Sequence, residues 1–321
     1  MILVRNYSRA LITGGAGFIG SHLVDRLIED GLEVTVLDNL SCGQQENLSL
    51  HVKDDSFHFV RGDIRDTGLV RGLVKGVDII FHEAAIVSVP LTIKDPALAH
   101  DVNVNGTLNI LTACLNSNVK GFVYASSCAV YGNAEVSPQN EGLPPSPISP
   151  YAATKVSAEG YCKAFHQVYG LETVALRLFN VYGPRQKLGE YSGVLVKFMD
   201  RLSRNEPPVI YGDGEQTRDF TYVEDVVEAH MLASNSKNAV GEVLNIATGD
   251  ATKICELVKI LSAVMDVAPL RPIYAESRPG DVRHSCGDIA KARRVLGYMP
   301  KFSLEEGLRM FFKWYELQNK R

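Results

Sequence analysis

The segment TGGAGFIG most strongly restricts what this chain can fold into. An apolar run at residues 10–13 precedes it, and a helical pattern over residues 18–30 follows it. Gly14, Gly17 and Gly20 recur at every third position. Such glycines give a tight turn, let the backbone approach a pyrophosphate, and let a helix pack closely on a strand. We therefore expect a strand, a phosphate-binding turn and a helix, which together begin a dinucleotide-binding unit.

A carboxylate at the end of the next predicted strand extends this pattern. Asp38 closes the run at residues 33–38, about twenty residues after the glycines. A carboxylate there accepts hydrogen bonds from a ribose diol and repels a 2′-phosphate, which favours NAD over NADP. Asp38 alone is also consistent with a turn or a helix cap. Asp63, beyond the third predicted strand, is placed to reach the adenine, and its rival reading is an N-cap for the next helix.

Strands and helices alternate along the chain up to residue 178. Predicted strands occupy residues 10–13, 33–38, 57–61, 77–82, 121–126 and 172–178, and predicted helices occupy residues 18–30, 67–75, 96–117 and 150–169. Continuous apolar strands separated by helices indicate a parallel sheet that is covered on both faces. Right-handed crossovers then give an α/β, Rossmann-like doubly wound fold.

The character of the chain changes after residue 180. Residues 180–221 are rich in Gly, Pro and charge, with one predicted helix at 194–204. A helix at 223–234 and a strand at 242–246 are predicted to return to the sheet, and amphipathic helices are predicted at 254–265 and 304–315. We expect an NAD-binding domain of residues 1–180 plus about 221–250. A smaller, discontinuous α/β lobe of about 181–220 and 251–321 is expected to bind the substrate.

The charge balance and the cysteines of the chain indicate which kinds of partner and ligand to expect. The 33 Lys and Arg residues nearly balance the 37 Asp and Glu residues, and no long basic run indicates nucleic acid or an anionic membrane surface. The six cysteines are scattered without a CxxC motif, so neither a metal site nor a disulfide framework is indicated. No signal-peptide pattern is found, and no apolar stretch approaches the roughly 20 residues of a membrane span. We expect a soluble cytoplasmic protein.

The motif YAATK places Tyr151 and Lys155 four residues apart, on one face of a predicted helix. An ammonium near a phenol favours the phenolate and lowers the phenol pKa from about 10, which makes Tyr151 a usable general base and acid. Ser126 and Ser127 end a predicted strand, at the sheet edge where such folds bind ligands. Without the glycine-rich turn, a surface Tyr and Lys would be the simpler reading.

Seven motifs keep one order over nearly the whole chain: TGGAGFIG, Asp38-Asn39, SSCAVYG, YAATK, LFNVYGPRQ, YGDGEQTRDFTYVEDV and RPGD. Together they resemble the extended short-chain dehydrogenase/reductase superfamily. Within it they resemble the NAD-dependent nucleotide-sugar epimerases of the UDP-glucose/UDP-N-acetylglucosamine 4-epimerase type. The resemblance implies an isomerase that interconverts UDP-hexoses at C4 through a transient 4-keto sugar, with Ser127, Tyr151 and Lys155 as catalytic residues.

The resemblance also implies the residues of two binding sites. The NAD site would comprise Gly14, Gly17, Phe18, Ile19, Gly20, Asp38, Asn39, Ser41, Gly43, Asp63, Ile64, Ala84, Ala85, Asn103, Tyr151, Lys155 and Phe179. The UDP-sugar site would comprise Ser88, Ser127, Asn180, Val194, Leu195, Tyr211, Arg218, Arg278, Asp281 and Ser285. Two arginines suit a dianionic pyrophosphate because their planar forks of donors keep their charge. By the same resemblance, the helices at 96–117 and 150–169 pair with their copies in a homodimer.

The two residues that follow Ser127 indicate which reaction the enzyme would catalyse. Dehydratases of this superfamily typically carry Asp-Glu there, and decarboxylases of the UDP-xylose-forming type resemble Ser-Glu. This chain has Cys128 and Ala129, which cannot perform that acid–base work. A dehydratase, a decarboxylase, a UDP-glucuronate 4-epimerase and a reductase with exchangeable cofactor remain alternatives within the superfamily. A non-catalytic NAD-binding regulator is the alternative from another class, and the intact Ser127, Tyr151 and Lys155 argue against it.

The identity of the sugar depends on Ser285, four residues after Asp281. Relatives restricted to unsubstituted hexoses tend to have a bulky Tyr at the matching place. A serine leaves volume beside the sugar C2 substituent, so we expect turnover of UDP-N-acetylglucosamine and UDP-N-acetylgalactosamine, together with UDP-glucose and UDP-galactose. The alternative is that Ser285 is an ordinary loop residue and that loop shape decides the specificity.

Overall fold

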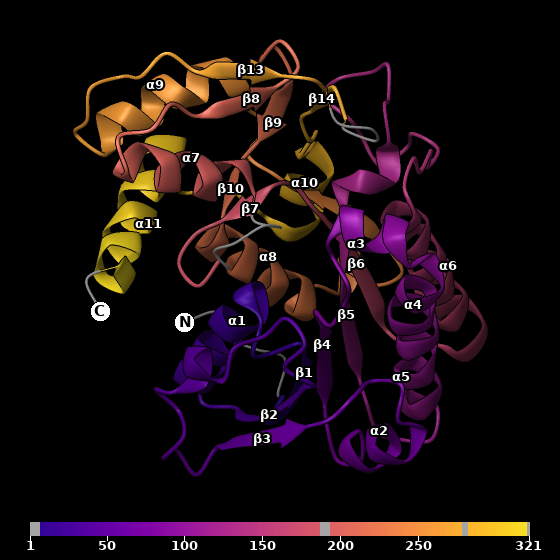
Figure 1. The fold of residues 1–321 in the computed structure, drawn as a ribbon. Helices are drawn as coiled ribbons and strands as arrows, with labels where there is room; N and C mark the ends of the chain where they lie inside the picture. Colours follow the sequence, from indigo (N-terminus) through magenta and orange to yellow (C-terminus); the bar gives the residue numbers. More distant parts are fainter. Residues whose placement is uncertain (1–6, 187–192, 278–281, 320–321) are drawn as a thin grey trace.

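The computed structural model describes residues 7–186, 193–277 and 282–319. Its centre is a seven-stranded parallel sheet in the order β11-β6-β5-β4-β1-β2-β3 (Figure 1). The strands are β1 (Arg9–Thr13), β2 (Glu33–Asp38), β3 (Phe57–Arg61), β4 (Ile79–His82), β5 (Gly121–Ser127), β6 (Thr173–Leu178) and β11 (Val243–Ile246). The strand order reverses between β1 and β4, which is where open α/β sheets bind ligands at their carboxyl edge. The predicted doubly wound fold is confirmed.

Helices cover both faces of the sheet because successive strand residues point to opposite sides. Leu11 packs into one apolar core and Ile12 into the other. The core around Ile12 includes residues of α1 (Phe18–Glu29), α8 (Val223–Asn235) and α10 (Ala290–Leu296). The core around Leu11 includes residues of α2 (Thr67–Leu73), α5 (Gly106–Cys114) and α6 (Pro150–Tyr169). Burial on both faces explains why these strands are continuously apolar in sequence.

The single helix predicted at residues 96–117 is wrong in detail. The chain forms α4 (Pro96–His100), a π-helical segment (Asp101–Asn105) and then α5. A short helix before it, α3 (Val89–Lys94), was not predicted. The π-helical segment turns Asn103 inward, where its side chain bonds Ile86 and Thr154. These contacts are distant in sequence, so helical periodicity alone could not show the interruption.

A separate lobe lies over the carboxyl edge of the sheet (Figure 1), and it contains a third apolar core. It is built by α7 (Val194–Ser203), α9 (Ile254–Val264) and α11 (Leu304–Asn319). Short strands surround it: β7 (Val181–Tyr182), β8 (Val209–Tyr211), β9 (Thr217–Asp219), β10 (Thr221–Tyr222), β12 (Ala251–Lys253), β13 (Ile273–Ala275) and β14 (His284–Ser285). These were not predicted, because runs this short carry no visible alternation. Helix α10 packs into the core around Ile12 rather than into this third core. The division into two domains stays a prediction.

Helix α6 carries both residues of the YAATK motif, and local signals place its start. Ser149 is its N-cap, accepting a hydrogen bond from the Ala152 backbone N–H at 3.2 Å, and Pro150 occupies the first turn. Tyr151 therefore lies in the first turn, at the helix end nearest the carboxyl edge of the sheet. The outer face of α6 exposes Tyr161 and Val168. The predicted pairing of this helix across a homodimer stays a prediction.

Candidate active site

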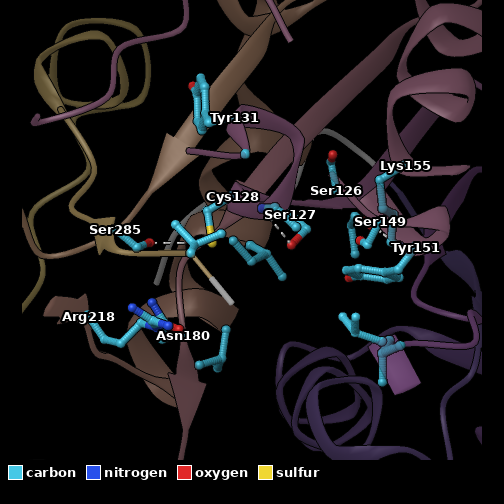
Figure 2. Close-up of a pocket in the computed structure, with 18 of the residues that line it drawn as sticks. Ser126, Ser127, Cys128, Tyr131, Ser149, Tyr151, Lys155, Asn180, Arg218 and Ser285 are labelled. Atoms are coloured by element: carbon cyan, nitrogen blue, oxygen red, sulfur yellow. Dashed lines mark hydrogen bonds between the residues drawn. The ribbon is translucent and has the colours of Figure 1, made fainter. Parts of the chain in front are cut away.

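A cavity of about 470 Å³ lies between the carboxyl edge of the sheet and the second lobe. The ends of β4, β5 and β6, the start of α6, and the β9 and β14 strands contribute to its walls. Of the residues predicted to form the sites, it is lined by Phe18, Ile19, Ser127, Tyr151, Lys155, Asn180, Arg218 and Ser285. Figure 2 shows Ser127 between Tyr151 on one side and Ser285, Asn180 and Arg218 on the other. The fold thus brings together residues that are far apart in sequence.

The three predicted catalytic residues meet in this cavity. The Tyr151 phenol and the Ser127 hydroxyl line the cavity together, and Ser127 is near enough to lower the pKa of the phenol. Lys155 Nζ donates to the Ala125 carbonyl oxygen at 2.6 Å and lies 5.8 Å from the centre of the Tyr151 ring. Tyr124 offers a second ring face, with its centre 4.9 Å from the same Nζ. The ammonium is therefore held beside the phenol but bonded to the backbone.

Burial dominates the protonation of this group. It raises the pKa of Tyr151 to about 12, although the hydrogen bond with Ser127 lowers it in part. Burial also lowers the pKa of Lys155 to about 8, against the upward effect of Glu83 and Glu159. The sequence-based expectation of a lowered phenol pKa is thus not met in the protein alone. The physical reason is that the phenolate loses water, while the ammonium bonds a carbonyl rather than the phenol oxygen.

A buried polar network lies beneath Ser127. Ser126 Oγ donates to Glu159 Oε1 at 2.5 Å. Glu159 also accepts two hydrogen bonds from Arg177, at 2.9 and 2.8 Å, and both side chains are nearly inaccessible. The Arg177 guanidinium lies over the Tyr131 ring at 4.7 Å, and the Tyr131 hydroxyl donates to Asn245 at 2.7 Å. The network joins α6, β5, β6 and β11, and it fixes the strand end that carries Ser127.

Sequence reasoning did not identify Glu159 or Arg177. Glu159 stands four residues after Lys155, one further turn along the same helix face, so spacing could have indicated it. Nothing local in sequence singles out Arg177, because its partner lies on another element.

The glycine-rich turn fits a dinucleotide. Gly14 has a φ of 72°, and a Cβ there would lie 2.7 Å from the Ala84 backbone nitrogen. A Cβ at Gly20 would collide with the Gly14 carbonyl oxygen. Gly17 is the N-cap of α1 and supplies no side-chain cap, which leaves the helix N-terminus open toward an anion. These glycines hold the turn, α1 and β4 close together, as a pyrophosphate-binding turn requires.

Acidic residues border this turn as predicted. The buried Asp38 carboxylate accepts hydrogen bonds from the Ala16 and Leu40 backbone N–H groups at 3.0 and 2.8 Å, and desolvation raises its pKa. Asp63 pairs with Arg65 at 2.9 Å, and hydrogen bonding from Arg65 lowers its pKa. The N-cap of α2 is Asp66, so the capping role considered for Asp63 is wrong. A fixed carboxylate at the end of β2 fits a ribose diol.

The other predicted cofactor residues lie around this turn or support it. Asn39 donates to Asp63 at 3.0 Å and accepts from the Ser41 backbone N–H. A Cβ at Gly43 would meet the Asp38 carboxylate. Three further predicted residues are buried in the apolar cores or between elements: Ile64, Asn103 and Phe179. Ala85 directly follows Ala84 at the end of β4.

The predicted substrate residues divide into three groups. Asn180, Arg218 and Ser285 line the cavity, with Ser285 Oγ 3.7 Å from Cys128 Sγ. Residues Val194, Leu195, Tyr211 and Ser88 are not among those that line the cavity. Leu195 is buried in the third core, and the Ser88 hydroxyl accepts a hydrogen bond from the Leu91 backbone N–H as the N-cap of α3. Arg278 and Asp281 lie outside the described residues.

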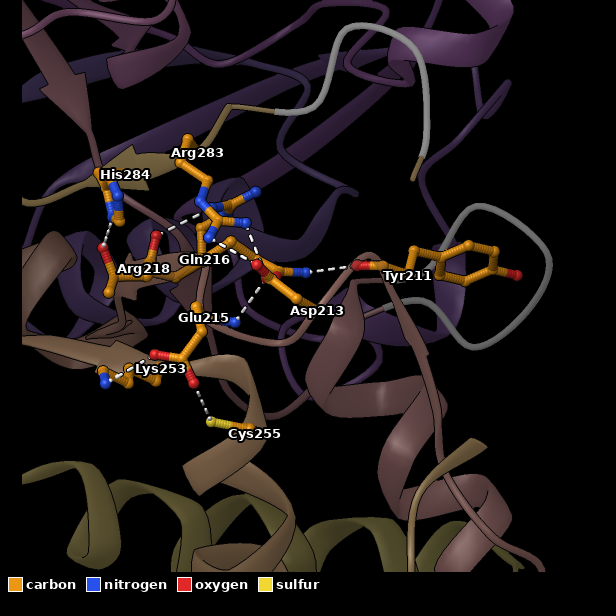
Figure 3. Close-up of polar contacts among 10 residues, drawn as sticks. Tyr211, Asp213, Glu215, Gln216, Arg218, Lys253, Cys255, Arg283 and His284 are labelled. Atoms are coloured by element: carbon orange, nitrogen blue, oxygen red, sulfur yellow. Dashed lines mark hydrogen bonds and ion pairs between the residues drawn. The ribbon is translucent and has the colours of Figure 1, made fainter. Parts of the chain in front are cut away.

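Polar contacts tie together the two segments that carry Arg218 and Ser285 (Figure 3). Strands β9 and β14 pair in parallel, and outside them Arg283 makes two ion contacts with Asp213 at 2.7 and 2.8 Å. Gln216 donates to the Tyr211 carbonyl oxygen at 2.7 Å. These contacts fix the wall of the cavity opposite Tyr151.

Two further properties concern the part of the chain that the structure describes. No group of His, Cys, Asp or Glu side chains in it is placed to hold a metal ion. None of its helices combines the length and apolar character that crossing a membrane requires.

The fold and the cavity are those of a dinucleotide-dependent enzyme, and Ser127, Tyr151 and Lys155 line that cavity together. The family model for the NAD dependent epimerase/dehydratase family matches residues 10–247. The chain therefore belongs to this family, and its cofactor is NAD.

Named relatives agree with this assignment. The UDP-glucose 4-epimerase of Mycolicibacterium smegmatis is 40% identical over 94% of this chain and 96% of its own. A solved UDP-N-acetylglucosamine 4-epimerase of Methanobrevibacter ruminantium, in complex with UDP-N-acetylmuramic acid, is 40% identical with a TM-score of 0.92, covering 97% of this chain and 99% of its own. A solved UDP-glucose 4-epimerase of Thermus thermophilus in complex with NAD is 38% identical with a TM-score of 0.86, covering 96% and 99%. The predicted assignment as an NAD-dependent enzyme of the epimerase type is confirmed at the level of the family.

Proteins of other activities are also similar to this chain. A dTDP-glucose 4,6-dehydratase is 35% identical, and a UDP-N-acetyl-alpha-D-glucosaminuronate decarboxylase is 33% identical. Overall similarity therefore leaves the choice of reaction to the residues of the cavity.

Proposed function

We propose that this protein is an NAD-dependent isomerase that inverts UDP-hexoses at C4. Its substrates are UDP-N-acetylglucosamine and UDP-N-acetylgalactosamine, together with UDP-glucose and UDP-galactose. The observation that carries the proposal is the cavity itself, where Ser127, Tyr151 and Lys155 converge next to the neutral Cys128. Tyr151 is thus the acid–base group at the sugar, and among the described residues Cys128 and Ala129 stand where sister enzymes keep a second acid–base pair.

The roles of the residues follow from their positions. Tyr151 removes the proton from the sugar 4-hydroxyl and returns it after the sugar has turned over as a 4-keto species. Ser127, which lines the cavity with the phenol, donates a hydrogen bond to the same sugar oxygen. Lys155 supplies positive charge beside the phenol. The chemistry that bound NAD supplies is reversible hydride transfer with sugar C4.

NAD and the UDP portion of the substrate would bind on opposite sides of the cavity. The glycine-rich turn and Asp38 would hold NAD, with the pyrophosphate against the open N-terminus of α1. Arg218 and Asn180, on the opposite wall, would hold the UDP portion of the substrate. A guanidinium suits a diphosphate because it presents several donors and keeps its charge.

The alternatives within the family find less support in this cavity. Dehydration or decarboxylation needs a further acid–base pair beside the catalytic hydroxyl, and Cys128 and Ala129 occupy that place. A uronate needs a cation of its own. Among the described residues that line the cavity, the Lys and Arg side chains are Lys155 and Arg218, and both already have roles in this proposal.

The product of the reaction tests the proposal. The purified protein is incubated with UDP-glucose, UDP-N-acetylglucosamine and UDP-glucuronate in turn, without added NAD, and the products are resolved by NMR. We expect C4-inverted products from the first two substrates. A 4-keto-6-deoxy sugar or a pentose would show a dehydratase or a decarboxylase instead.

Ser285 is proposed to admit the N-acetyl group, because its small side chain lies at the cavity wall beside Cys128. We expect Ser285→Tyr to lower kcat/KM for UDP-N-acetylglucosamine by about tenfold or more, since a pocket that lacks volume excludes the larger group. Turnover of UDP-glucose should change much less. Ser285→Ala is the matched control, because it keeps the volume and should retain both activities. Unchanged turnover of the acetylated sugar by Ser285→Tyr would mean that loop shape decides the specificity.

A further inference from the structure

A buried acid and a buried histidine face each other behind the catalytic group, and the mechanism above uses neither. Glu83 directly follows β4 and continues its hydrogen bonding, donating its backbone N–H to the Thr13 carbonyl oxygen at 3.0 Å. Its Oε1 lies 2.9 Å from Nε2 of His230 on α8. The two side chains are 5% and 0% exposed. Charged groups this deeply buried must be paired to be tolerated.

The contacts of His230 define the charges of the pair. Its Nδ1 lies 2.8 Å from the Val226 carbonyl oxygen, which can only accept a hydrogen bond. Its Nε2 faces a carboxylate, which also accepts when ionised. With a hydrogen on Nδ1 and a carboxyl oxygen 2.9 Å from Nε2, the contacts favour the charged imidazolium of His230. Burial lowers the pKa of His230, but Glu83 raises it and the net shift is upward.

Glu83 lies on the side of this pair that faces the catalytic lysine. It lines the same cavity as Tyr151 and Lys155, whereas His230 is fully buried on the helix behind it. The register of β4 and β5 ends with His82 opposite Tyr124, and Glu83 and Ala125 are the next residues along the two chains. Ala125 is the residue whose carbonyl holds the Lys155 ammonium at 2.6 Å. Glu83 and the lysine thus line one cavity, and the backbone of Glu83 follows the strand position next to the one that holds the ammonium.

The Lys155 ammonium needs such a charge. It is buried, and among the described residues it makes no ion pair; its hydrogen bond is to the Ala125 carbonyl. Burial lowers its pKa to about 8, and the largest opposing effect comes from Glu83. A neutral Lys155 would no longer favour the phenolate of Tyr151. The other titratable groups that interact electrostatically with Lys155 or with Glu83 are Glu159, Cys162, His82, Tyr124 and Tyr151.

We propose that Glu83, held in place by His230, is a positioning residue whose carboxylate keeps the Lys155 ammonium charged and so keeps Tyr151 competent as a base. This rests on the proposed function, which makes Tyr151 the base. The effect is electrostatic and acts through Lys155. Removing the charge of Glu83 should therefore change the pH at which Lys155 loses its proton.

The test follows the proton on Lys155 directly. Protein labelled with 13C at the lysine ε-carbon is titrated by NMR with NAD present, and the Lys155 resonance is assigned by its loss in Lys155→Arg. We expect Glu83→Gln to move the Lys155 midpoint to lower pH by about one unit, because a neutral amide no longer favours the charged ammonium. The alkaline limb of the kcat profile should move the same way. Glu83→Asp, which restores a carboxylate, should recover part of the shift.

Two further variants separate the electrostatic effect from a structural one. Glu83→Gln with His230→Gln leaves no buried charge unpaired, so it protects against misfolding. It should still show a downward shift, smaller than that of Glu83→Gln because the cation of His230 is removed as well. Glu242→Gln removes a carboxylate that pairs with Lys291 at the surface, and it should leave the Lys155 midpoint unchanged. An unmoved Lys155 midpoint in both Glu83 variants would overturn the proposal, even if turnover fell. Failure of the proposed function would appear separately, as products that are not inverted at C4.

Discussion

Replacing Tyr151 with Phe is expected to lower kcat for C4 inversion by about 10²- to 10⁴-fold, the range that a positioned general acid–base group contributes. The phenol oxygen is the only part of the side chain removed, and the ring remains to fill its buried place in the cavity. KM should change little, because the residues proposed to hold the nucleotide lie on the opposite wall. Steady-state kinetics with UDP-N-acetylglucosamine and UDP-glucose measure both quantities.

Tyr161 provides the matched control for this change. It lies on the same helix, nearly three turns further on, but it is 38% exposed and does not line the cavity. Tyr161→Phe should leave kcat within about twofold of the parent, since it removes a surface hydroxyl. If Tyr151→Phe retained most of the parent kcat, another group would have to be the base, and Ser127 would become the first candidate.

Much of this site could be predicted because it rests on local signals. The glycines of the phosphate-binding turn, the alternation of strand and helix, and the spacing of Tyr151 and Lys155 are all visible within short windows. The parallel sheet then brings the ends of separate strands to one edge, so that Ser127 reaches the same cavity. Residues that act at the carboxyl edge of a sheet are therefore open to prediction once the strands are identified.

The features that sequence reasoning missed depend on contacts between distant segments. In the π-helical segment Asp101–Asn105, the buried Asn103 side chain donates a hydrogen bond to Thr154 on another helix. Glu83 gains its partner from α8, and Arg177 gains its partner from α6. Periodicity within one element carries no signal of such pairs.

The protonation of the site could not be predicted from residue types alone. Tyr and Lys at helical spacing suggested a lowered phenol pKa, yet the pKa of Tyr151 is raised to about 12. Desolvation depends on how completely the surrounding elements close over a side chain, and that is a property of the tertiary structure. The motif indicates which groups take part, whereas the packing determines their charge.

Removing the Glu159 carboxylate should destabilise the protein more than any other single truncation of a charged group considered above. Glu159 and Arg177 form a buried, doubly hydrogen-bonded pair, with exposed fractions of 7% and 5%. Glu159→Ala leaves the guanidinium in a low-dielectric core without its counter-charge. We expect the free energy of unfolding to fall by about 3–5 kcal/mol, as measured by urea denaturation monitored by circular dichroism. The substitution should also disturb the active site, because Ser126, the neighbour of Ser127, would lose its hydrogen-bond partner.

The surface pair of Glu242 and Lys291 is the control for this loss of charge. Its two atoms are also 2.8 Å apart, but Glu242 is 45% exposed, so Glu242→Ala should cost less than about 1 kcal/mol. Combining Glu159→Leu with Arg177→Met should cost less than Glu159→Ala alone, because no charge is then left unpaired. Equal costs for Glu159→Ala and Glu242→Ala would show that the buried pair contributes no more than a surface pair. In that case Arg177 would have to be compensated by its contact with the Tyr131 ring instead.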